Sequence, residues 1–242
     1  MKIKLLLVLL AVFLFSTDAL SQSVVITGKK ITYTRKNPVA DFKKNFTINY
    51  PKVKARNPAV SRKIEAAIDY RTILGINLKE ELTAPQWLEE ADYDVDYNAN
   101  GILSITLSMN GTGAYPSGIQ RIVVVDTTAG NRVKAADVFK NVSSLIALIQ
   151  KAQDKEVAAS ITAIKSDPDN IDPDPAGLFA RAKIRPADLE WFSVDERGVT
   201  FHYDYGFPHV ILAMQPDGTF FFSWAQIKPF IRPDGLLKAM VR

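Results

Sequence analysis

Residues 102–133, ILSITLSMNGTGAYPSGIQRIVVVDTTAGNRV, are the most strongly strand-forming part of the chain. In its first part, apolar residues alternate with polar ones, and the apolar positions are Leu103, Ile105, Leu107 and Met109. This period of two is typical of a strand with one buried face. A glycine-containing connection, residues 110–118, leads to a second apolar run at residues 119–126. We therefore predict a meander of two strands whose serine and threonine side chains face outward, then a turn at residues 127–130 and a further strand.

The other strands and helices follow from the same two periodicities. Alternation predicts hairpins at residues 24–35 and 192–205, and strands at residues 46–50, 91–97 and 220–224. Helical spacing predicts helices at residues 58–74 and 137–165, the second interrupted near Lys140, and shorter helical pieces from Thr83 and at residues 225–231. These elements indicate an α+β fold of two layers, with a mainly antiparallel sheet and helices packed on one side.

The first 21 residues have the layout of a secretory signal peptide. Lys2 and Lys4 precede an apolar run at residues 5–15, and Ala19 and Ser21 are small residues before a cleavage site. A membrane-spanning helix needs about 20 apolar residues, so this run is too short to form a stable membrane anchor. We therefore expect an exported protein, periplasmic or extracellular after cleavage of the signal peptide.

Composition narrows the classes of function. The chain of 242 residues is 47% hydrophobic and 23% charged, which is typical of a folded domain. We place a single domain at residues 22–242, with two subdomains that meet near residues 166–190 as the alternative. Lysine and arginine are scattered, which argues against a nucleic-acid partner. Because the chain contains no cysteine, disulfides, thiol nucleophiles and cysteine-based metal sites are excluded.

Four short motifs, taken in order along the chain, resemble those of one protein family. They are Tyr50-Pro51, then Gly113-Ala114-Tyr115-Pro116, then Asp126-Thr127-Thr128-Ala129-Gly130 with Asp137-Val138-Phe139, and finally Tyr205-Gly206-Phe207-Pro208-His209. Together they resemble the extracytoplasmic domain of PdaC-like peptidoglycan deacetylases and of RsiV-like anti-sigma factors. The resemblance covers residues 45–235, and it implies a two-layer α+β fold.

The same resemblance carries expectations about function. In the anti-sigma relatives the domain is similar to a sensor that grips lysozyme, and in the deacetylases it stands beside the catalytic domain without catalysing deacetylation. The chain departs from both groups, because it shows neither an internal transmembrane helix nor an appended catalytic domain. We therefore do not expect transmembrane control of a sigma factor.

No group of residues forms a recognisable catalytic or metal site. The two histidines, His202 and His209, lack the spacing of a zinc site, and recruitment of Asp204 to a metal is a minor alternative. We expect His202 on a surface strand and His209 in a packed corner. The acidic residues between 166 and 175 do not match a calcium-binding loop: Asp167, Asp169, Asp172 and Asp174. We expect no catalytic residue, no metal and no cofactor.

Two stretches are candidates for ligand contact. The connection between the central strands contributes Asn110, Tyr115 and Pro116, since loops on a rigid sheet often carry recognition. The last family-like motif contributes Tyr205 and His209. The alternative is structural: the glycines serve turn geometry, and the aromatic side chains complete the core.

We therefore expect a non-catalytic exported binding module of the cell envelope. Its partner is expected to be a cell-wall component, such as a peptidoglycan fragment, or a secreted protein such as lysozyme. Two alternatives stay open: a cell-wall hydrolase or deacetylase with an unrecognised site, and an envelope protein with a structural or assembly role.

The mature protein is expected to begin near Gln22, because cleavage after Ser21 satisfies the small-residue rule. N-terminal sequencing of secreted material measures this directly. Secreted protein that still begins at Met1 would contradict the signal-peptide interpretation.

Overall fold

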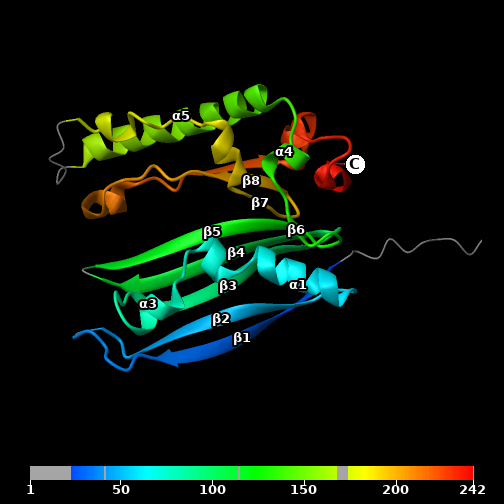
Figure 1. The fold of residues 1–242 in the computed structure, drawn as a ribbon. Coiled ribbons are helices and arrows are strands. Elements are labelled where there is room, and N and C mark those ends of the chain that lie inside the picture. The colour runs from blue at the N-terminus through cyan, green and yellow to red at the C-terminus, as the bar shows by residue number, and fades with distance from the viewer. Residues whose placement is uncertain (1–22, 41, 114, 168–173, 242) are drawn as a thin grey trace, which may run out of the picture.

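The computed structural model describes residues 23–241 except 41, 114 and 168–173. The predicted signal peptide and the acidic residues Asp169 and Asp172 lie outside the described residues. The described chain forms two β-sheets with helices packed against them (Figure 1). The α+β class with a mainly antiparallel sheet is therefore confirmed. The second sheet is an addition to the expected two layers, and helices pack against both sheets.

The larger sheet has six strands arranged in chain order. Its strands are β1 (Val25–Thr34), β2 (Asn45–Lys54), β3 (Leu88–Ala99), β4 (Ile102–Thr112), β5 (Pro116–Asp126) and β6 (Asn131–Arg132). All neighbours are antiparallel except β2 and β3, which pair in parallel over two residues. The central meander predicted from residues 102–126 is therefore confirmed as β4 and β5.

The predicted hairpin at residues 24–35 is wrong, because β1 is one continuous strand. Gly28 lies opposite Pro51 in the middle of the pairing with β2. A Cβ atom at Gly28 would lie 2.5 Å from Oδ1 of Asn49. The Asn49 side chain uses this space and donates to Oδ1 of Asp92 on β3 at 2.9 Å. The glycine therefore makes room for a side chain from the neighbouring strand, and it does not form a turn.

Three short helices cover one face of the larger sheet: α1 (Pro58–Ala67), α2 (Tyr70–Ile73) and α3 (Leu78–Leu82). Asn57 caps α1 as its sequence position indicates, with its side chain accepting from the N–H of Ala59. The predicted helix at residues 58–74 is divided, because Asp69 caps a new helix by accepting from the N–H groups of Arg71 and Thr72. The prediction of a short helix beginning at Thr83 is also wrong, because the helix in this region, α3, ends at Leu82.

The smaller sheet lies over the opposite face and consists of β7 (Phe192–Val194), β8 (Gly198–His202) and β9 (Thr219–Ser223). The other helices are α4 (Ala135–Val138), α5 (Val142–Ser166) and α6 (Trp224–Ile227), with the 3-10 helices η1 (Gly177–Phe179), η2 (Pro186–Glu190), η3 (His209–Met214), η4 (Lys228–Phe230) and η5 (Leu236–Val241). The predicted break near Lys140 is confirmed, since Asn141 takes a left-handed conformation between α4 and α5.

Strand β4 is buried on both faces. Leu103, Ile105 and Leu107 pack into the core under α1 and α2, while Ile102 faces the core of the smaller sheet. Ser104, which we expected to face outward, is also fully buried. Its Oγ accepts from the N–H of Val194 and donates to the carboxylate of Asp96, both at 3.3 Å. These bonds satisfy the hydroxyl group where the two sheets meet.

A buried arginine joins the loop after β1 to the start of β3. Arg35 is 1% exposed and lies over the ring of Phe46. Its guanidinium donates to the carbonyl oxygens of Lys43, Glu81 and Leu88 and to the Glu81 carboxylate, at distances between 2.7 and 3.0 Å. The same carboxylate accepts from the N–H groups of Trp87 and Leu88.

None of the helices in the described residues has the length and hydrophobicity that crossing a bilayer requires.

Replacing Arg35 with methionine should lower the free energy of unfolding by about 3–5 kcal/mol, because it leaves a partly buried carboxylate and three carbonyl groups without their donor. Urea denaturation measures the loss. Arg71→Met is the matched control, since the Arg71–Asp69 ion pair is exposed and its removal should cost much less. Equal losses in the two variants would contradict the structural role of Arg35.

Candidate functional site

The structure brings together two of the residues expected to contact a ligand. Tyr115 lies at the tip of the β4–β5 hairpin, and His209 is the first residue of η3. Their rings are stacked, with centroids 5.1 Å apart and an interplanar angle of 27°. The Tyr115 side chain remains 62% exposed. Residues from distant parts of the sequence thus form one aromatic surface.

Exposed apolar side chains continue this surface along η3. Val210 is 85% exposed and Leu212 is also exposed, whereas Ile211 and Met214 pack into a small cluster with Phe179 and Phe207. The helix therefore presents one side to solvent while its other side is anchored. We define the tip patch as Tyr115, His209, Val210 and Leu212.

The other expected contact residues lie beside or beneath the tip patch. Asn110 and Pro116 are exposed on the hairpin, near its tip. Tyr205 instead belongs to the cluster under η3, where its hydroxyl donates to Oε2 of Glu156 at 2.6 Å. Burial, followed by this carboxylate, raises the pKa of the Tyr205 hydroxyl well above its usual range. The structural contacts of Tyr205 support η3 and so help to hold His209.

Trp87 fixes the hairpin on its other side. The N–H of Thr112 donates to the carbonyl oxygen of Trp87 at 3.2 Å. Gly111 packs so closely on this carbonyl that a Cβ atom would overlap it. The glycine at this position therefore allows a close approach of two backbones. The tip is held by the body of the protein on both sides.

Along β5, most of the outer edge has no partner strand among the described residues. Strand β6 pairs only with Val125 and Asp126. The N–H of Val133 donates to the carbonyl oxygen of Val124, so the polar groups of Val124 point outward. Because these directions alternate along a strand, the backbone groups of Ile122, Gln120 and Gly118 also point outward. The edge is therefore open from the hairpin tip to Ile122.

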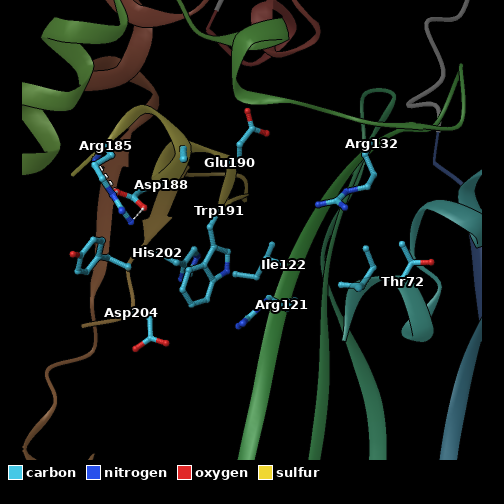
Figure 2. A pocket seen from close by; sticks show the side chains of 13 residues that line it. Thr72, Arg121, Ile122, Arg132, Arg185, Asp188, Glu190, Trp191, His202 and Asp204 are labelled. Carbon is cyan, nitrogen blue, oxygen red and sulfur yellow. Dashed lines mark hydrogen bonds and ion pairs between the residues drawn. The ribbon is translucent and has the colours of Figure 1, made fainter. Parts of the chain in front are cut away.

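A pocket of about 440 Å³ lies against this open edge (Figure 2). We call it the edge pocket. It is lined by residues from α2, β5, β6, η2 and the end of β8: Thr72, Ile73, Arg121, Ile122, Arg132, Arg185, Ala187, Asp188, Glu190, Trp191, His202, Tyr203 and Asp204. No two of its five walls are adjacent in the sequence except β5 and β6. The alternation of apolar and polar residues along single elements does not indicate which distant elements meet, so the edge pocket could not be predicted from the sequence.

The arginines of the edge pocket differ in their partners. Arg185 forms an ion pair with Asp188 at 3.1 Å. Within the described part of the chain, neither Arg121 nor Arg132 forms an ion pair. The Arg121 guanidinium is held 5.4 Å above the ring centroid of Trp191 and donates to the outward carbonyl of Gln120 at 2.8 Å. Two guanidinium groups are therefore available to an anion.

Trp191 contacts both Arg121 and His202, and the centroids of the Trp191 and His202 rings are 5.6 Å apart. The indole Nε1 of Trp191 is buried and has no hydrogen-bond partner among the described residues. His202 is half-buried, and its Nε2 lies 3.1 Å from Oγ of Ser193. Burial lowers the pKa of His202 to about 4, so the imidazole is neutral at pH 7. Our expectation for the histidines is reversed: His202 is packed and His209 is exposed.

The two histidines lie in different environments, one against Trp191 and the other on the tip patch. Among the residues that the structure describes, no three His, Asp or Glu side chains are gathered closely enough to hold a metal ion. Asp204, the ligand considered for a metal site with His202, instead accepts from the N–H of Gly206 at 2.8 Å.

Neither a family model nor a curated protein matches the sequence. Several solved structures match the fold, and two of them have a TM-score of 0.57 each. A member of the DUF3298 family from Bacteroides fragilis is 12% identical, and the match covers 91% of this chain and 98% of that protein. A DUF3298 family protein from Pseudomonas aeruginosa is 15% identical, with 87% and 95% covered. The chain thus has the fold of DUF3298 proteins, the family of PdaC-like and RsiV-like domains.

Acid should destabilise the protein through His202. Its pKa of about 4 in the folded state lies below the ordinary value of 6.5, so the unfolded chain binds more protons between these values. The contribution of His202 to the free energy of unfolding is therefore fully present above pH 6.5. It falls by on the order of 1–3 kcal/mol as the pH decreases toward 4.

The substitution His202→Gln removes the titration and keeps a polar group near Ser193. Urea denaturation between pH 4 and 7 should show the stability advantage of the natural protein over this variant shrinking as the pH falls. A difference that does not change with pH would contradict the assignment.

Proposed function

We propose that the protein is an exported, non-catalytic binding module of the cell envelope, related to the PdaC-like and RsiV-like domains, and that the tip patch is its contact surface. The observation that carries this proposal is the stacked, exposed pair of Tyr115 and His209. Aromatic side chains are enriched where proteins bind partners, because they bury a large area at a small cost in conformational entropy.

The tip patch is organised before any partner arrives. Trp87 holds the hairpin that carries Tyr115, and the cluster of Phe179, Tyr205 and Phe207 anchors the helix that carries His209. Fixing an aromatic surface in advance reduces the entropy lost on binding. The exposure of Val210 and Leu212 beside it supports a contact that buries apolar area.

The chemical class of the partner is inferred from the sequence. The signal-peptide pattern directs the domain to the cell envelope, and the family-like motifs are similar to those of lysozyme sensors and of deacetylase-associated domains. A peptidoglycan fragment offers sugar faces that stack on Tyr115, and a secreted protein such as lysozyme offers a cleft that an exposed aromatic side chain can enter. Shared fold alone does not supply this function, so the proposal rests on the site.

A double substitution, Tyr115→Ala with His209→Ala, should weaken binding to the partner at least tenfold without changing the fold, because both side chains are exposed. Biolayer interferometry with immobilised lysozyme, and pull-down with insoluble peptidoglycan, measure the two partner classes separately. Phe221→Ala is the matched control, since it removes an exposed aromatic side chain from β9.

Equal binding by the double variant and the natural protein would sink the assignment of the tip patch. Failure of the natural protein to bind lysozyme or peptidoglycan more strongly than an unrelated basic protein would contradict the proposed partners. Release of sugars or acetate from peptidoglycan by the purified protein would contradict the non-catalytic role.

A further inference from the structure

We propose that the edge pocket is a second binding site, and that it takes the free carboxylate end of a short extended peptide. The peptide would lie against Ile122 on the open edge of β5, with its terminal carboxylate between Arg121 and Arg132. This site is separate from the tip patch.

The first support is the pair of available guanidinium groups. Both Arg121 and Arg132 line the pocket, and their side chains extend into it from the wall formed by β5 and β6 (Figure 2). Guanidinium groups bind carboxylates through paired, charge-assisted hydrogen bonds. The contacts of Arg121 with Trp191 and with the carbonyl of Gln120 hold its guanidinium in place, so little side-chain entropy remains to be lost when an anion binds.

The second support is the backbone of Ile122. Its N–H and C=O point away from β4, and neither group has a hydrogen-bond partner among the described residues. An exposed strand edge of this kind accepts an extended peptide as an added strand. Gln120 is less available, because Arg121 already occupies its outward carbonyl. Pairing is therefore expected at Ile122, which lines the pocket.

The third support is the balance of charge, which selects a carboxylate over a polyanion. The pocket is lined by three arginines and three carboxylates, namely Asp188, Glu190 and Asp204. Asp188 is neutralised by Arg185, and Glu190 accepts from the N–H of Ala135 at the start of α4. Asp204 has no cationic partner within the described residues and would repel a second negative charge. A singly charged carboxylate therefore fits better than a phosphate.

The remaining lining suits a small side chain. Ile73, Ala187 and Trp191 supply apolar surface, and a pocket of about 440 Å³ is large enough for one or two residues. The buried Nε1 of Trp191 is an unused donor, and Figure 2 shows it pointing toward Ile122.

Two sources of a free peptide end are separated by the choice of probe. Isothermal titration calorimetry would compare a cell-wall stem pentapeptide ending in D-Ala-D-Ala with an L-alanine pentapeptide, and each with its C-terminal amide. We expect each amide to bind at least tenfold more weakly than its free acid, because it loses the charge that Arg121 and Arg132 recognise. Preference for the stem peptide would identify the cell wall as the source of the ligand; this part of the inference rests on the proposed envelope function. Preference for the L-peptide would identify a protein terminus.

Substitutions locate the site. Arg132→Gln should weaken binding of the free acid at least tenfold, and Arg121→Lys should weaken it because the paired geometry is lost while the charge remains. Arg197→Gln is the matched control: it removes an exposed, ion-paired arginine that lies outside the edge pocket, so the change should stay below threefold. All three side chains are exposed, so the fold should survive. The Trp191→Phe variant identifies the indole N–H resonance of Trp191 in ¹H–¹⁵N spectra, because that resonance is missing from its spectrum. In the natural protein, the same resonance should shift when the free acid binds.

The outcomes distinguish the edge pocket from the tip patch. The tip-patch double variant should bind the pentapeptide normally, and Arg132→Gln should bind the tip-patch partner normally. Equal binding of free acid and amide, normal binding by Arg132→Gln, or no binding of either free acid would overturn the assignment of the edge pocket. Loss of pentapeptide binding in the tip-patch variant would also overturn it, and would leave the tip patch as the site.

Discussion

The structure depends on the burial of β4 on both of its faces. Leu103, Ile105 and Leu107 pack under α1 and α2, whereas Ile102 and Ser104 face the smaller sheet. A shift of one residue in strand pairing would exchange these two sets and place polar side chains in the apolar core. Two-sided burial thus sets the register of β5 along its whole length, and that register determines which residues reach the hairpin tip and which line the outer edge.

Both candidate sites follow from this placement of β5. Its hairpin end carries Tyr115 to His209, and its outer edge leaves Ile122 open beside Arg121. The segment after β8 runs beside β5, from His202 at the edge pocket to His209 at the tip patch (Figure 1). A ligand in the pocket and a partner on the patch would therefore contact the same two segments.

Open strand edges are a hazard, because they invite association with other chains. Here Arg121 folds back over the edge and occupies the carbonyl of Gln120, and β6 covers Val125 and Asp126. Among the groups that remain uncovered, those of Ile122 lie in the edge pocket, whose lining carries three arginines and three carboxylates. An extended ligand that pairs with Ile122 would therefore need to be small and to carry a matching charge.

Features that depend on neighbouring residues could be predicted from the amino-acid sequence. Alternation at residues 102–126 predicts β4 and β5, the Asn57–Pro58 pair predicts the start of α1, and the break near Lys140 falls beside the left-handed Asn141. Other features depend on contacts between segments that are distant in the sequence. Ser104 is buried because a second sheet covers it, Gly28 continues a strand because Asn49 needs its space, and Tyr115 meets His209 because η3 is anchored nearby. The edge pocket likewise depends on contacts between distant segments, and local periodicity contains no information about such contacts.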